Sequence, residues 1–204
     1  MGLSRRRFLL ASAAVPAAVA LGSCDGDEEQ ATRRPSATDA TGSRELPPTP
    51  ACEDGDEPSP EQTEGPFYTP DTPRRRNLAE EGVEGSPLVL TGAVLDTRCR
   101  PVAGALLDFW QADGNGEYDN SGFRLRGHQF ADSRGRFRLA TVVPGAYSAR
   151  TRHIHVKVQR RGGDVLTTQL YFPNEPANAA DGIFDERLVM DVSGRRARFD
   201  FVVA

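Results

Sequence analysis

The chain has 204 residues, of which 38% are hydrophobic and 26% charged, and its formal net charge at pH 7 is −4. An acidic chain without a basic stripe is a poor candidate for binding nucleic acid, so we exclude that class of partner. Its 20 glycines and 15 prolines favour a fold with many turns.

The first 23 residues have the organisation of a bacterial export signal. Three arginines at positions 5–7 precede Phe-Leu-Leu and an alanine-rich apolar run that ends near Leu21, which is too short for a comfortable membrane span. Paired arginines before such a run resemble the twin-arginine signal, and the Leu-Gly-Ser-Cys sequence that ends at Cys24 resembles a bacterial lipobox. We expect residues 1–23 to be removed and Cys24 to carry a lipid that holds the exported protein on the outer side of the cytoplasmic membrane. The alternative is an ordinary cleaved signal in which Cys24 is incidental.

Residues 24–58 form an acidic, proline-rich segment with almost no large apolar side chain. Such a segment cannot bury enough surface to offset the entropy lost on ordering, so we expect a disordered tether. The remaining stretch, 59–204, has roughly 145 residues, which suits one domain with a workable core.

Two cysteines remain besides Cys24, namely Cys52 in the tether and Cys99 in the domain. In an exported protein two leftover thiols more often pair than stay free. We therefore expect a disulfide between Cys52 and Cys99 that fixes the end of the tether to the domain. Two unpaired, buried thiols are the alternative.

Residues 59–204 consist of short strand-like runs separated by turn signals such as Gly-Asn-Gly and Arg-Gly-Gly. No run of useful length has a helical period. This pattern predicts an all-β fold, a sandwich or barrel, with Phe109 and Trp110 in its core. The expected strands are Pro87–Asp96, Ala105–Gln111, Gly135–Thr141, Arg152–Gln159, Val165–Phe172 and Ala197–Val203.

The stretch from Tyr147 to His155 concentrates a phenol, a guanidinium and two of the three histidines of the chain. On a strand, His153 and His155 share a face and lie roughly 7 Å apart along it, while Ile154 takes the opposite, core-facing side. Two imidazoles so placed can reach one metal ion. Taken alone, Tyr147 after Pro-Gly is more typical of an aromatic side chain at the start of a strand.

Several motifs follow one another in an order that is typical of one family. They are Thr63-Glu-Gly-Pro-Phe-Tyr68, Ala105-Leu-Leu-Asp-Phe-Trp-Gln-Ala-Asp113, Gly116-Glu-Tyr118, Thr141-Val-Val-Pro-Gly-Ala-Tyr147, Arg150-Thr-Arg-His153-Ile-His155 and Gln169-Leu-Tyr-Phe172. Each motif is weak alone, but in this order they resemble the intradiol ring-cleavage dioxygenases, typified by protocatechuate 3,4-dioxygenase and catechol 1,2-dioxygenase. The resemblance covers most of the expected domain.

The resemblance implies a β-sandwich and a single mononuclear Fe(III) per chain, held by two tyrosinates and two histidines. Carried over by position in the motifs, the ligands are Tyr118, Tyr147, His153 and His155. The resemblance also implies that Tyr147 leaves the iron when substrate binds and helps to take a proton, while Tyr118 stays. His128 matches no ligand position.

Other residues receive roles from the same resemblance. Arg150 matches the family arginine three residues before the first ligand histidine and is implied to stabilise negative charge on the substrate. Gln169 matches the glutamine that lies near that arginine. Tyr68 and Pro66 belong to a segment that borders the substrate in relatives. One departure is the linker between Tyr147 and His153, which has only five residues where the soluble members have a longer loop.

The function we expect is O₂-dependent cleavage of catechol-type rings between the two hydroxylated carbons, giving cis,cis-muconate-type products. Its partners are a catechol-type small molecule and O₂, with no membrane contact beyond the lipid anchor. The sequence leaves the ring substituents and the oligomeric state open. Two alternatives are a non-catalytic extracytoplasmic β-sandwich that binds a surface ligand, and a copper-binding protein that uses the same histidine pair.

Overall fold

The computed structural model describes residues 57–204. The expected export signal, Cys24, nearly all of the expected tether and Cys52 lie outside this part of the chain. Within it, no helix is both long and apolar enough to cross a membrane. Cys99 is disulfide-bonded, but its pairing with Cys52 stays a prediction because Cys52 is not among the described residues.

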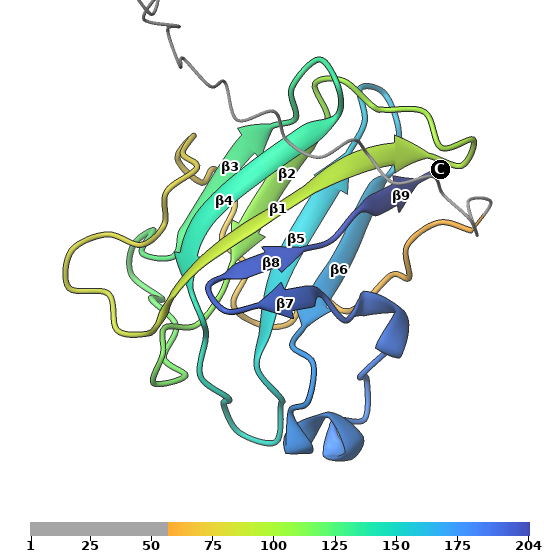
Figure 1. Ribbon diagram of the computed structural model, residues 1–204. Coiled ribbons are helices and arrows are strands. Elements are labelled where there is room, and N and C mark those ends of the chain that lie inside the picture. The colour runs from red at the N-terminus through yellow and green to blue at the C-terminus, as the bar shows by residue number, and fades with distance from the viewer. Residues whose placement is uncertain (1–56) are drawn as a thin grey trace, which may run out of the picture. The chain divides into compact units, whose positions relative to one another are not determined.

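The described residues form nine β-strands and two short 3-10 helices (Figure 1). The elements in chain order are β1 Pro87–Asp96, β2 Leu106–Trp110, β3 Arg126–Phe130, β4 Arg136–Val142, β5 His153–Gln159, β6 Val165–Tyr171, η1 Pro176–Ala180, η2 Glu186–Leu188, β7 Asp191–Ser193, β8 Arg196–Arg198 and β9 Phe201–Val203.

The strands are divided between two sheets. One has the order β4-β1-β8-β7, with β9 also paired to β1, and the other has the order β3-β2-β5-β6. Figure 1 shows β1 and β4 of the first sheet lying across β2 and β5 of the second. The predicted all-β sandwich is therefore confirmed.

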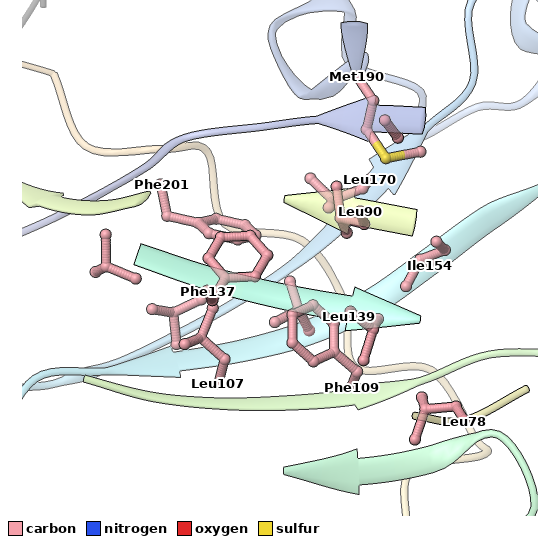
Figure 2. Close-up of a cluster of buried hydrophobic side chains, with 14 of the residues drawn as sticks. Leu78, Leu90, Leu107, Phe109, Phe137, Leu139, Ile154, Leu170, Met190 and Phe201 are labelled. Atoms are coloured by element: carbon pink, nitrogen blue, oxygen red, sulfur yellow. The ribbon is translucent and has the colours of Figure 1, made fainter. Parts of the chain in front are cut away.

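The core lies between the two sheets, where alternate side chains of facing strands meet. Phe109 from β2 and Ile154 from β5 are fully buried there, together with Leu139 from β4. Figure 2 shows these side chains gathered with Phe137 and Phe201. The predicted alternation of β5 is confirmed, because Ile154, Val156 and Val158 are all 0% exposed members of this core.

Five of the six predicted strands match the structure within one residue at each end. The prediction of one continuous strand over Ala197–Val203 is wrong, because β8 and β9 are separate and both pair in parallel with β1. The chain approaches β1 very closely between them: a Cβ on Gly92 would lie 1.7 Å from the carbonyl oxygen of Phe199. There the carboxylate of Asp200, not a backbone carbonyl, accepts the N–H of Ala93 at 2.7 Å, so the ladder is interrupted.

Residues 59–78, which we call the N-terminal strap, cross the outer face of the β3-β2-β5-β6 sheet. The strap begins beside β9, where the N–H of Ser59 donates to the carbonyl of Val202 at 2.9 Å, and passes β6, where the N–H of Gln62 donates to the carbonyl of Thr167 at 2.8 Å. It then pairs with the edge of β3, where the N–H of Arg75 donates to the carbonyl of His128 at 2.9 Å, and ends beside β4, where the N–H of Leu78 donates to the carbonyl of Ala140 at 2.8 Å. Midway, the Tyr68 hydroxyl donates to Asp108 on β2 at 3.1 Å. This sheet is therefore covered on both faces, by the core and by the strap.

Candidate metal centre

The register of the second sheet places His155 opposite Trp110 on β2 and opposite Gln169 on β6. Residues directly opposite one another on neighbouring strands project from the same face of the sheet. These side chains therefore stand on the face that the N-terminal strap covers. Trp110 is fully buried, as predicted, but it lies outside the core between the sheets and stacks on His155, with ring centroids 4.7 Å apart and planes at 8°.

The two histidines of β5 turn their Nε2 atoms toward each other. The Nε2 atoms lie 3.1 Å apart, and both side chains are almost completely buried. Nδ1 of His153 lies 2.6 Å from the carbonyl oxygen of Thr151. Because a carbonyl only accepts, this contact places the proton on Nδ1 and leaves the lone pair of Nε2 available to a metal.

The surroundings of both histidines favour the neutral imidazole. Burial lowers the pKa of His153 to about 4. Burial, reinforced by the neighbouring His153, lowers the pKa of His155 well below its ordinary value. A metal ligand must be deprotonated, so this pair is ready to bind a cation at neutral pH.

Tyr118 and Tyr147 come from two loops that touch through glycine backbones. A Cβ on Gly116 would lie 2.4 Å from the carbonyl oxygen of Ala146, and a Cβ on Gly145 would lie 2.5 Å from the nitrogen of Gly116. Only glycine permits so close an approach. As a result the rings of Tyr118 and Tyr147 meet edge to face, with centroids 5.4 Å apart.

The four predicted ligands lie together. The ring centroid of Tyr118 is 6.4 Å from that of His155, and the centroid of Tyr147 is 5.9 Å from that of His153. Burial raises the pKa of Tyr118, although the charges of Arg150 and Arg126 oppose this shift. A phenol in such a place stays protonated until a strong cation binds, since a nearby multivalent metal favours the phenolate.

Arg150 is held by two partners beside this group. A tight turn precedes it, in which the N–H of Arg150 donates to the carbonyl of Tyr147 at 2.9 Å. The Arg150 guanidinium donates from Nε to both oxygens of Asp181, at 3.0 and 2.8 Å, and from Nη2 to Oε1 of Gln169 at 2.6 Å. Burial disfavours the charged guanidinium, but the hydrogen bond and charge of Asp181 outweigh it and raise the pKa of Arg150.

Asp181 and Phe67 are two residues of this site that sequence reasoning missed. Asp181, which follows η1, also accepts the N–H of Thr151 at 3.0 Å. Phe67 lies in the strap and stacks on Tyr118, with centroids 4.4 Å apart and planes at 19°. The Gly-Pro-Phe-Tyr segment was a usable signal for Phe67, whereas nothing in the sequence around Asp181 indicates its role.

The residues predicted to contact substrate lie in the same strap. Tyr68 packs its ring against Trp110, with centroids 4.8 Å apart, and burial and the neighbouring Asp108 raise its pKa to about 12. Pro66 is exposed and directly precedes Phe67. Their contact with a substrate stays a prediction. His128 lies apart, with Nδ1 2.7 Å from the carbonyl of Thr72.

The donors present fit a hard, trivalent metal ion. Within residues 57–204, no group of three or more His, Cys, Asp or Glu side chains is arranged to hold a metal, and the two histidines stand with two tyrosines instead. Phenolate oxygen and neutral imidazole nitrogen suit ferric iron. Two Nε2 atoms at 3.1 Å converge on one point, as one shared cation requires.

Comparison with known proteins bears on the family of this chain. A family model described as "Dioxygenase" matches residues 63–201. Among curated proteins, the chain is 36% identical over 118 residues to the protocatechuate 3,4-dioxygenase beta chain of Burkholderia cepacia, covering 49% of this chain and 50% of that one. It is 30% identical over 147 residues to hydroxyquinol 1,2-dioxygenase of a Rhizobium species, covering 59% and 50%. The chain thus spans about half the length of the curated relatives it matches.

Solved structures show the same likeness over most of the described region. The dioxygenase domain of a dioxygenase and carbohydrate-binding protein fusion from the cellulolytic bacterium Streptomyces sp. SirexAA-E is 51% identical with a TM-score of 0.70, covering 72% of this chain and 98% of that domain. Hydroxyquinol 1,2-dioxygenase from Pseudomonas putida is 26% identical with a TM-score of 0.65, covering 71% and 66%. With the family model matching well over half of its length, the chain belongs to the intradiol ring-cleavage dioxygenases.

Proposed function

We propose that the protein is a non-haem Fe(III) dioxygenase that cleaves catechol-type rings between the two hydroxylated carbons and yields cis,cis-muconate-type products. The observation that carries this proposal is the cluster of Tyr118, Tyr147, His153 and His155, whose neighbouring ring centroids lie 4.7 to 6.4 Å apart. Membership of a family whose curated relatives are named for protocatechuate, hydroxyquinol and catechol supports it.

Each ligand in this proposal has a distinct protein environment. His153 and His155 bind through Nε2, with the orientation of His153 fixed by the Thr151 carbonyl. Tyr118 is held against Phe67 and stays a ligand throughout. Tyr147, which begins a tight turn, would as a metal-bound phenolate take a proton from the incoming catechol, acting as a positioned general base.

Ferric iron bound here would supply Lewis-acid activation of a catechol towards O₂. Arg150 supplies a fixed positive charge for the negative charge that develops on the substrate. Its guanidinium is anchored by Asp181 and Gln169, so no reorganisation is required when that charge appears, and such preorganised cations are most effective where water is excluded. Trp110 stacks on His155 and Phe67 stacks on Tyr118, so an aromatic ring flanks one ligand of each kind.

The test is to load the purified protein with ferric iron and follow its visible spectrum and products. We expect a red-brown colour from the tyrosinate–iron pair, a shift of that band when catechol is added under nitrogen, and ring-opened products by mass spectrometry once O₂ is admitted. A colourless protein that binds a ligand without turnover would favour a binding module. A copper signal without tyrosinate absorption would favour a copper-binding protein.

We also propose that the protein is exported and anchored through a lipid on Cys24. The arginine pair and lipobox-like sequence before Cys24 support this, and a disulfide-bonded Cys99 suits an oxidising compartment. Metabolic labelling with a fatty acid tests it: the native chain should incorporate label in the membrane fraction, and Cys24→Ser should not. Native protein that is found in the medium without fatty-acid label would contradict lipidation and favour an ordinary cleaved signal peptide.

A further inference from the structure

Arg126 is a buried arginine at the edge of the candidate metal centre. It begins β3, lies opposite Trp110 in the sheet, and is 1% exposed. Burying a guanidinium is costly unless its donors are satisfied, and an apolar side chain would fill such a space without that cost. The contacts of Arg126 are therefore informative.

The guanidinium donates to two backbone carbonyls from distant parts of the chain. Nε and Nη2 both donate to the carbonyl oxygen of Asp119, at 3.1 and 2.8 Å. Nη1 donates to the carbonyl oxygen of Phe67 in the N-terminal strap. The planar fork of arginine can serve two acceptors at once in this way, which a lysine cannot reproduce.

Both carbonyls belong to residues that adjoin Tyr118. Asp119 directly follows Tyr118 in the chain, and the ring of Phe67 stacks on the ring of Tyr118. Arg126 therefore links the loop that carries one candidate ligand to the ring that covers it. The Asp119 carboxylate stays free of Arg126, because it accepts N–H groups of Ser121, Gly122 and Arg124 within its own loop.

The backbone before Arg126 is shaped to turn this side chain inward. Leu125 has φ of 56°, a left-handed conformation that is uncommon for a residue other than glycine, and its side chain is buried. Arg75 adds support from the strap, because its Nε donates to the carbonyl of Arg126 at 2.8 Å. Strained residues persist where their surroundings hold them and occur often at functional sites.

We propose that Arg126 is a positioning residue for the dioxygenase site, which ties Phe67 to the Tyr118 loop and thereby fixes the Tyr118 ring in the orientation that iron binding needs. This inference rests on the proposed function for its meaning, but the link between the two segments exists without iron. In this inference Arg126 is not a ligand itself and acts only through Phe67 and Tyr118.

The test uses hydrogen–deuterium exchange on the iron-free full chain, with Arg126→Met, Arg126→Lys and a matched control, Arg124→Met, whose side chain is exposed in the same loop. We expect Arg126→Met to raise exchange at residues 64–68 and 117–122 by about 10-fold, because charge-assisted hydrogen bonds hold both segments. Exchange in Arg126→Lys should lie between that of the wild type and that of Arg126→Met. Exchange in β5 and β6 should be unchanged in both variants. After iron loading, Arg126→Met should weaken iron affinity by about 10- to 100-fold, as loss of outer-shell partners does, and shift the visible band.

The outcomes separate this inference from the proposed function. Exchange equal to that of Arg124→Met, or a rise spread evenly over β5 and β6, overturns the positioning role and leaves Arg126 as an ordinary buried residue. If exchange rises only at residues 64–68 and 117–122 but the iron-loaded protein never turns over catechol, the link between Phe67 and Tyr118 is supported and the proposed dioxygenase function is contradicted. If Arg126→Met does not fold, Phe67→Leu replaces it: this variant keeps the carbonyl that Arg126 binds but removes the stacked ring, so the band should shift without a rise in exchange at 117–122.

Discussion

The Nε2 atoms of His153 and His155 face each other at 3.1 Å on one side of β5. At this distance the two nitrogens either share a neutral hydrogen bond donated by Nε2–H of His155 or direct their lone pairs to one cation. Both imidazoles stay neutral in either arrangement, as burial favours, and the proposed function assigns the second.

His155→Ala should abolish stoichiometric iron binding, because it removes one of four ligands and the stacking partner of Trp110. The measurement is iron content after loading and desalting. His128→Ala is the matched control, since it removes the third histidine of the chain from outside the site and should retain iron. Equal iron contents in the two variants would contradict the assignment of the His pair.

Tyr147→Phe should keep most of the iron but lower turnover of catechol by on the order of 100-fold, because it removes the proton acceptor. Tyr118→Phe should lose both iron and colour, since Tyr118 is assigned to remain bound. Iron content and initial rates, measured side by side, check the pair. Parental turnover in Tyr147→Phe would remove its role in proton transfer.

Asp181→Asn should lower turnover by about 10- to 100-fold with little loss of iron, as outer-shell changes do, because Arg150 loses the carboxylate that fixes Nε. It should also destabilise the fold by on the order of 3 kcal/mol, the cost of breaking a buried ion pair. Asp185→Asn is the control, since Asp185 pairs with the largely exposed Arg187 at 2.7 Å and should change stability by at most about 1 kcal/mol. Similar losses in both variants would argue against a special role for Asp181.

The stabilising effect of Asp181 should depend on pH. Burial alone would raise the pKa of its carboxyl, but hydrogen bonds from Arg150 and from the N–H groups of Ile183 and Thr151 lower it below 3.8. A carboxyl whose pKa is lower in the folded state stabilises the fold above its unfolded pKa, and this contribution disappears as pH falls through the folded pKa. The difference in unfolding free energy between wild type and Asp181→Asn should therefore be constant near neutral pH and shrink below about pH 4. A difference that persists to pH 3 would contradict this.

Peptide mapping without reduction should recover a Cys52–Cys99 peptide. Loss of that bond in Cys52→Ser should lower stability by about 2 to 4 kcal/mol, as for other native disulfides. Cys24→Ser is the control, because its thiol is assigned to lipid and its stability should not change. A Cys24–Cys99 peptide would disprove both the disulfide and the lipid assignment.

Alternation of apolar and polar residues predicted most of the fold, because five strands bury one face against the core. The pattern failed for β3, whose core-facing side carries Gly127 and Gln129 and whose other side carries Arg126 and His128. No apolar alternation marks such a strand. It pairs with β2 along its whole length and with the strap at His128 on its other edge, so tertiary context decides its conformation.

The site was predictable in the parts that are local in sequence. The period of a β-strand places His153 and His155 on one face without further information. The contact between the rings of Tyr118 and Tyr147 depends on the close approach of Gly116 and Gly145. The hydrogen bonds from Arg150 to Asp181 join residues 31 positions apart. Such contacts are set by how loops pack in three dimensions, which no single stretch of sequence records.

The glycine contact between the two tyrosine loops also bears on how the protein would bind the proposed iron. One of these loops joins β4 of the first sheet to β5 of the second, and the other leaves β2 of the second sheet. A ferric ion bound by both loops would cross-link segments that come together only when the sandwich has folded. The complete binding site would therefore exist only in the folded chain. Metal uptake should then track global folding, and the melting temperature should climb with free iron concentration as one cooperative transition.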